Sequence, residues 1–230
     1  MKKILVIIAV ILVVVLLACC LAGAVYLLNR RNQQRQSALG FKDVYNQYIA
    51  AANKVNTKLD EFSTLEQERN TLVDKMETAA NAGDNTEVLK AIDDVEANVD
   101  KQQSLVDEIN TAVMQENSLV MRLASESAKV EPASLKSSAA NLAVKAAEGN
   151  AVENDFRALL QTSIDIDRKF ITTYRNAANG SITTDEFKTE NMEEDKELDE
   201  NNAARNVKAA EYRRLRDEIR QEWLAVQRKI

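Results

Sequence analysis

The 230-residue chain contains no histidine, one proline, five glycines and two cysteines. Without histidine it cannot form a Ser-His-Asp triad, a Cys-His pair or a His-ligated zinc or haem site. Two cysteines are too few for a four-cysteine zinc site or a disulfide framework. So few glycines and prolines are atypical of a turn-rich β protein or a dinucleotide-binding α/β fold. These absences favour a helical protein.

The remaining composition is that of an ordinary folded chain with a modest acidic excess. Hydrophobic residues make up 45% and charged residues 29%, and 30 Lys and Arg stand against 36 Asp and Glu, a formal net charge of −6. This balance is not that of a disordered chain. An acidic chain without aromatic residues interleaved on a basic face is also a poor candidate for binding nucleic acid, so none is expected as a partner.

Residues 4–28 form a continuous run without a single charged side chain. A helix of that length rises about 37 Å, which exceeds the roughly 30 Å hydrocarbon core of a bilayer. The sequence therefore predicts a short tail (1–3), a transmembrane signal anchor (4–28) and a basic, polar juxtamembrane segment (29–40). Both cysteines lie inside the predicted anchor, where small buried hydrophobic residues are their simplest role.

Two alternatives to an uncleaved anchor remain open. Ala22-Gly23-Ala24 fits the small-residue rule of a signal-peptide cleavage site, and Leu16 to Cys19 partly matches a lipoprotein processing site. The apolar run is longer than the core of an ordinary signal peptide and continues to Leu28 beyond the cleavage candidate. The uncleaved anchor is therefore favoured, and the protein is expected to be a single-pass membrane protein.

The charges that flank the predicted anchor are close to balanced. Lys2 and Lys3 precede it, and Arg30, Arg31 and Arg35 follow it. A very short tail with two lysines is typical of a bacterial signal anchor that leaves the tail inside the cell. We therefore expect an extracytoplasmic domain at the plasma membrane, with the cytoplasmic orientation still open.

A long apolar repeat is the strongest pattern after the anchor. The spacing alternates between four and three residues, which is the 3.5-residue repeat of supercoiled helices. Its members are Val88, Ile92, Val95, Val99, Gln102, Val106, Ile109, Val113, Glu116, Val120, Leu123 and Ser127. Leu89, Leu105, Ala112 and Leu119 widen the stripe on one side, so the helix is expected to pack against more than one neighbour.

Similar stripes divide residues 41–230 into four helices of nearly equal length. Gly83, Pro132 and Gly180 mark the breaks, and Thr183 with Glu186 predicts a capping box. The expected helices are residues 41–82, 86–130, 132–178 with a kink near 149, and 184–230. Short connections between long helices favour an antiparallel arrangement. The predicted fold class is thus all-α: an N-terminal transmembrane helix followed by an elongated, coiled-coil-like antiparallel four-helix bundle.

This arrangement of an N-terminal anchor and a long helical bundle resembles the general plan of LemA-like proteins and of bacterial chemoreceptor sensor domains. The resemblance concerns architecture and rests on no matched motif, and a shared fold does not establish a shared function.

No group of residues in the sequence predicts an active site, so no enzymatic activity, catalytic residue, metal or cofactor is expected. The acidic groups Asp93-Asp94, Asp165/Asp167 and Glu193-Glu194-Asp195 lack the glycine and the spacing of a calcium loop. They are interpreted as solvated helix faces, because charged residues are seldom buried without a partner. Asn179-Gly180-Ser181 matches an N-glycosylation sequon in an expected loop.

The last predicted helix is acidic in its first half and basic near its end. If the chain returns to the membrane, its arginines are candidates for contact with anionic headgroups. The candidate membrane-proximal basic residues are Arg30, Arg31, Arg35, Arg213, Arg214, Arg216 and Arg220. The expected function is a membrane-anchored, non-enzymatic bundle for protein interaction, scaffolding or spacing at the cell surface, and the alternative is a ligand-sensing bundle that signals through a partner. The expected partners are membrane lipid and another protein, with the bundle a monomer or a homo-oligomer.

Overall fold

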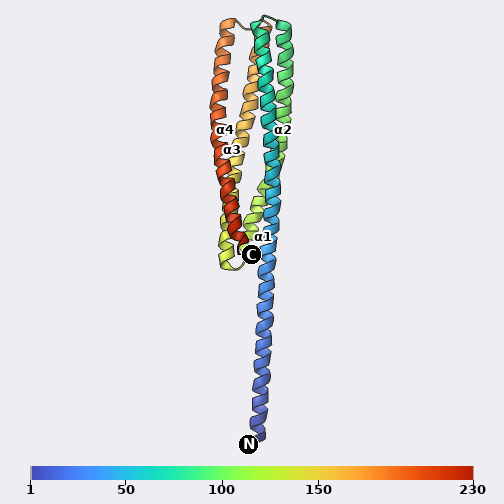
Figure 1. Cartoon of the computed structure of the whole chain (residues 1–230), viewed down its shortest axis with the longest axis vertical. Helices are drawn as coiled ribbons and strands as arrows, with labels where there is room; N and C mark the ends of the chain where they lie inside the picture. The colour runs from blue at the N-terminus through green and yellow to red at the C-terminus, as the bar shows by residue number, and fades with distance from the viewer. Residues whose placement is uncertain (1, 230) are drawn as a thin grey trace.

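The computed structural model describes the backbone of residues 2–229 and the side chains of residues 21–229. It contains four long helices: α1 (Lys2–Asn81), α2 (Asn85–Lys129), α3 (Ala133–Ala178) and α4 (Thr184–Gln227). Consecutive helices pack against each other in antiparallel fashion (Figure 1). This confirms the prediction of an all-α antiparallel bundle.

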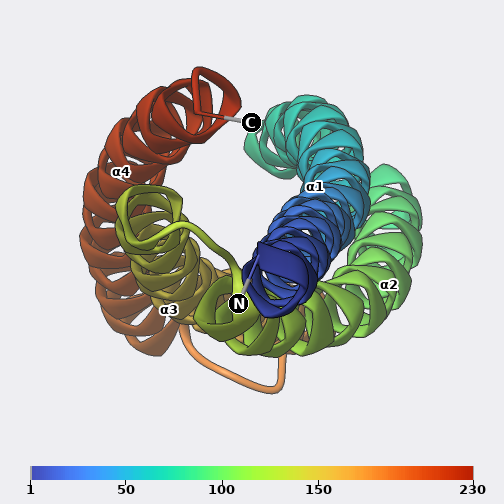
Figure 2. The ribbon, with the colours of Figure 1, turned by 90° about the horizontal axis from the view of Figure 1, so that it is seen from below.

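The helices lie around one axis in chain order, as Figure 2 shows in the view along the bundle. Long side chains connect α4 with α1. The Tyr45 ring stacks on the Trp223 indole with 3.9 Å between ring centroids, and Arg216 Nη2 donates a hydrogen bond to Asn53 Oδ1 over 3.2 Å. Large side chains thus span the distance between the first and the last helix.

Helix α1 is longer than the bundle and extends from it as a stalk (Figure 1). It passes through residues 29–37 without interruption, and Ala38 is the first buried residue among its side chains described from Leu21 onward. Within the described part of the chain, no helix has the length and apolarity needed to cross a membrane. Most of the predicted anchor, residues 4–20, lies outside the described side chains, so the anchor remains a prediction.

Glycines and caps define the turns at the end of the bundle away from the stalk. Gly83 and Gly180 have φ of 74° and 69°, in the left-handed region that favours glycine at a helix C-terminus. The Asp84 side chain accepts hydrogen bonds from the first turn of α2. The predicted capping box begins α4, with Thr183 and Glu186 each accepting from the other's backbone. These two turns form the distal end in Figure 1, and the last residues of α4 lie at the stalk end.

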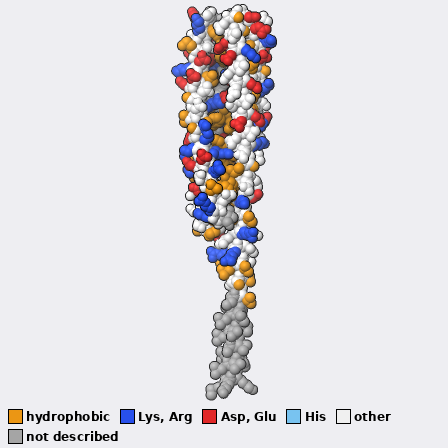
Figure 3. All heavy atoms as spheres, in the orientation of Figure 1, with side chains coloured by type: hydrophobic (Ala, Val, Ile, Leu, Met, Phe, Trp, Pro, Cys, Tyr) orange, Lys and Arg blue, Asp and Glu red, His pale blue; other side chains and the backbone are white. Residues whose placement is uncertain are grey.

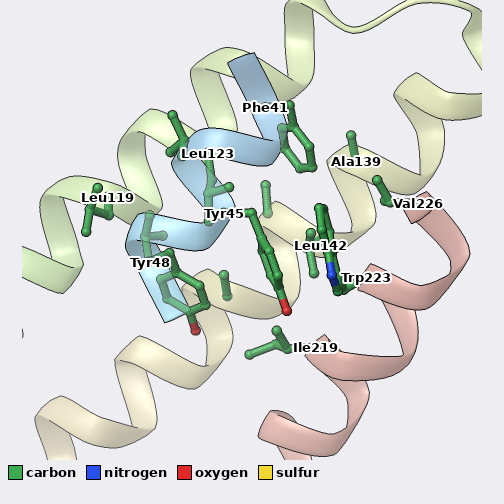
Figure 4. Packing of buried hydrophobic residues seen from close by; sticks show 14 of the residues in the cluster. Phe41, Tyr45, Tyr48, Leu119, Leu123, Ala139, Leu142, Ile219, Trp223 and Val226 are labelled. Carbon is green, nitrogen blue, oxygen red and sulfur yellow. The ribbon is translucent and has the colours of Figure 1, made fainter. Parts of the chain in front are cut away.

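The core consists of two apolar clusters stacked along the bundle. The cluster at the stalk end draws on all four helices and includes Phe41, Tyr45, Leu123, Leu142 and Trp223 (Figure 4). The distal cluster is built from α1, α2 and α3, and α4 contributes only the partly buried Phe187 to it. The distal half of α4 therefore joins the bundle with little apolar packing.

All twelve residues of the repeat predicted from Val88 to Ser127 are buried, including Gln102 and Glu116. In α3 the stripe expected after Gly149 is Val152, Phe156, Leu159, Ile166, Phe170 and Ala177, flanked by Leu160, Ile164 and Tyr174. The three flanking residues are buried, whereas only Val152 and Ile166 of the stripe are. Phe156 and Leu159 are only partly buried, whereas Leu160 and Ile164 are fully buried. The helix continues through Gly149, whose missing side chain lets the Ile219 side chain of α4 approach closely.

Candidate functional site

The predicted basic residues occupy two separate levels of the molecule. Arg30, Arg31 and Arg35 are exposed on the stalk just before the bundle begins. Arg213 and Arg214 are exposed on α4, fourteen or thirteen residues before its end at Gln227. At 1.5 Å per residue this places them about 20 Å from the stalk end of the bundle. The structure does not bring these two sets together.

Arg216 and Arg220 differ in their surroundings. Arg220 is exposed on α4. Arg216 is half-buried between α4 and α1, and its Nη1 donates to the Tyr212 hydroxyl over 3.3 Å while its guanidinium lies over the Tyr212 ring, 5.7 Å from the centroid. Its charge is therefore directed toward the interior of the bundle.

Sequence reasoning missed a buried carboxyl pair between the two apolar clusters. Glu116 of α2 is 1% exposed and Glu153 of α3 is 3% exposed, and each carboxyl group is close enough to affect the pKa of the other. Burial, together with the charge of its neighbour, raises the pKa of Glu116 to about 8. Burial raises the pKa of Glu153 to about 7. Near neutral pH the pair thus retains a proton.

Groups from the other two helices complete this polar layer. The Tyr212 hydroxyl of α4 donates to Glu153 Oε1 over 3.4 Å, and the buried Tyr48 of α1 neighbours Glu116. Arg216 adds a positive charge that opposes the rise in both glutamate pKa values. One oxygen of each carboxyl group, Oε2, has no hydrogen-bond partner. This arrangement binds a proton but offers no activated nucleophile with an adjacent base.

A second polar cluster holds the distal half of α4. Arg205 of α4 forms a bidentate ion pair with Glu66 of α1, with 2.8 Å between Nη2 and Oε2. Asn201 donates to the Ser163 hydroxyl of α3 over 2.7 Å. Arg69 Nη1 of α1 lies 2.7 Å from Asp167 Oδ1 of α3.

The interpretation of Asp167 and Glu194 as solvated acids is wrong. Asp167 is 4% exposed and Glu194 is 8% exposed. Arg69 compensates the buried charge of Asp167, although burial still raises the pKa of this carboxyl to about 6. The Thr173 hydroxyl donates to Glu194 Oε1 over 2.8 Å. Arg69 and Thr173 stabilise the two buried carboxyl groups, and both come from positions distant in the sequence. A local charge pattern does not reveal such partners.

A groove of about 470 Å³ follows the boundary between α1 and α4 beside this cluster. Phe156 of α3 contributes to its lining, and the Arg205 guanidinium lies 5.9 Å from the Phe156 ring centroid. The other lining residues are mostly uncharged and polar: Ser63, Gln67, Asn70, Asn202 and Asn206. The groove has the size and polarity to accept a small polar molecule.

Within residues 21–229, no three cysteine, aspartate or glutamate side chains are grouped so as to hold a metal ion. Comparison of the chain with protein-family models, with characterised proteins and with solved structures finds no match.

Proposed function

We propose that the protein is a membrane-anchored, non-enzymatic helical bundle that holds an interaction surface at a fixed distance from the membrane. The observation that carries the proposal is the continuity of α1. One helix contains the uncharged run 4–28, the exposed arginines of the stalk and the buried face that begins at Ala38. An unbroken helix transmits position and orientation far better than a flexible linker.

The dimensions of the bundle support a spacing role. Helix α2 has 45 residues, equivalent to about 67 Å. The distal half of α4 presents an acidic surface with Met192, which is 72% exposed, in its middle. Its exposed acids are Asp185, Glu186, Glu190, Glu193, Asp195, Glu197, Asp199 and Glu200. We assign the interaction to this surface, and a basic protein is the complementary partner.

Site-specific photo-crosslinking in cells tests this proposal. A photoreactive residue replaces Met192 in the full chain, and the matched control carries it at Met114, which is 61% exposed on α2. The proposal predicts that the chain fractionates with membranes and that a discrete adduct forms at position 192 but not at 114. A chain that stays in the soluble fraction, or equal adduct patterns at the two positions, would contradict it.

The groove between α1 and α4 favours a second candidate, a ligand-sensing bundle. Its lining combines an aromatic ring with several amide groups, two guanidinium groups and the Glu66 carboxylate. A thermal-shift screen of the detergent-solubilised full chain against small polar molecules tests this candidate. A ligand that raises the melting temperature of the wild type, but not that of Asn202→Leu, would support it, and an absence of hits would favour the first proposal.

A further inference from the structure

Exposed basic side chains lie on the stalk and at the ends of the helices that meet it. We call this group the basic collar. It consists of Arg30, Arg31, Arg35 and Lys42 of α1, Lys129 at the end of α2, Lys136 in the first turn of α3, and Arg228 and Lys229 directly after α4. Figure 3 shows Lys and Arg side chains collected near this junction, whereas Asp and Glu are more frequent toward the distal end.

The collar opposes the charge of the rest of the bundle. Its segments, residues 29–43, 126–136 and 228–229, contain eight basic residues and three acidic ones. The bundle's other segments, residues 44–125 and 137–227, contain twenty basic and thirty-three acidic residues. An anionic surface is therefore attracted to one end of the molecule and repelled by the other.

Most of the collar's positive charges are not neutralised by ion pairs within the described part of the protein. Among the described residues, Lys129 is the only collar member with such a partner, Glu126 at 2.7 Å. Lys229 Nζ donates to the Ser134 carbonyl oxygen over 3.0 Å and to the Ser138 hydroxyl over 2.7 Å. Both acceptors are neutral, so the ammonium group is positioned without being neutralised.

The collar also lies at the right height above a membrane. If the hydrocarbon region ends at Leu28, the bundle begins ten residues later at Ala38, a rise of about 15 Å. The headgroup layer occupies about 5–7 Å of this distance. The bundle end is then about 8–10 Å from the headgroups, close to the screening length of about 8 Å at physiological salt. Lysine and arginine side chains extend into the remaining space.

We propose that the basic collar docks the stalk end of the bundle onto anionic phospholipid headgroups and so holds the bundle upright on the membrane. This inference rests on the anchoring proposed above, since the anchor brings the collar to the surface. Juxtamembrane clusters of lysine and arginine are attracted to anionic leaflets in general. Repulsion of the acidic distal half disfavours a bundle that lies flat.

Lysine footprinting of the full chain in two kinds of vesicle tests the proposal. One vesicle contains phosphatidylcholine alone, and the other contains equal amounts of phosphatidylcholine and phosphatidylglycerol. After flotation, a water-soluble amine reagent modifies exposed lysines, and mass spectrometry gives the rate at each site. We expect Lys129 and Lys136 to react several-fold more slowly on the anionic vesicle, and high salt to restore the rate. Lys101, exposed on α2 about 42 Å from Lys129, is the internal control.

Charge reversal separates the collar from a general effect of net charge. In the variant Lys129→Glu/Arg228→Glu, Lys136 should react with the amine reagent at the same rate on both vesicles. In the control variant Lys101→Glu, Lys136 should still react more slowly on the anionic vesicle. Equal rates at Lys136 on both vesicles, with the chain floating on both, would overturn the collar inference and leave the anchoring intact. A chain that floats only on anionic vesicles would support the collar and refute the anchor. A chain that floats on neither would refute both.

Discussion

Glu116 of α2 and Glu153 of α3 form a buried pair of neighbouring carboxyl groups inside the bundle, at the boundary between its two apolar clusters. Charged groups and hydroxyl groups from three helices lie near this pair: Tyr48 of α1, Arg157 of α3, and Tyr212 and Arg216 of α4. The pair combines the features that raise carboxyl pKa values, namely burial and a neighbour of like charge.

This relationship predicts an unusual pH dependence of stability. The folded-state pKa values, about 8 for Glu116 and about 7 for Glu153, lie above the ordinary value of 4.5. The folded state therefore binds more protons than the unfolded state between these values, and the free energy of unfolding falls as the pH rises from about 4.5 to about 8. Asp167, with its pKa raised to about 6, adds to the same trend at the acidic end. Denaturant unfolding of the full chain in detergent at a series of pH values measures this slope.

The variant Glu116→Gln removes one ionisable group while keeping the shape of the side chain. It should flatten the dependence between pH 6 and 8, because its amide donates to Glu153 without titrating. Glu68→Gln, at an exposed position of α1, is the control and should keep the wild-type slope. A wild type whose stability is constant across this range would show that the pair does not retain a proton.

The core substitution Ile109→Ala should strongly destabilise the bundle. Ile109 is 1% exposed in the distal cluster, and truncation of a buried isoleucine to alanine costs about 2–5 kcal/mol. Met114→Ala, on the exposed face of the same helix, should change stability by less than about 0.5 kcal/mol. Equilibrium unfolding compares the two. Equal effects would mean that the two residues are equally buried and that the α2 register is different.

The first half of α4, at the distal end, should unfold locally more readily than its second half, at the stalk end. Residues 184–205 are attached mainly through polar contacts such as Arg205–Glu66 and Asn201–Ser163, whereas Leu215, Ile219, Trp223 and Val226 belong to buried apolar surface. Segments with few buried apolar contacts open locally at lower free energy. Hydrogen exchange followed by mass spectrometry should therefore show faster exchange in residues 184–205 than in 215–226. Uniform protection along α4 would show that the polar contacts hold as firmly as the apolar ones.

Sequence periodicity was sufficient to predict the number of helices, their antiparallel packing and the buried face of α2. It succeeded there because apolar residues fill almost every position of the repeat. It failed in α3 after Gly149, where Glu153 and Asp167 occupy buried positions and Phe156 of the expected stripe is only partly buried. A buried acid and a solvated acid look the same in a sequence. What distinguishes them here is a partner such as Arg69, 98 residues from Asp167 along the chain.

The basic collar was also only partly predictable. The stalk arginines are adjacent in sequence and were identified directly. Lys129, Lys136 and Lys229 are separated along the chain and join them only because the helices turn back. Arg213 and Arg214 are an adjacent pair like Arg30 and Arg31, yet they lie about 20 Å from the stalk end of the bundle.

Thiol labelling at the distal turn tests most directly the central claim, a bundle held outside the cell by an uncleaved anchor. Asn179 is exposed at the C-terminus of α3, and the chain's two cysteines, Cys19 and Cys20, both lie within the predicted anchor. Asn179→Cys therefore provides a single accessible thiol. A membrane-impermeant maleimide should label this variant, but not the wild type, in intact cells of a host without an outer membrane, and the labelled chain should remain in the membrane fraction. Labelling that appears only after lysis would place the bundle in the cytoplasm and contradict the account.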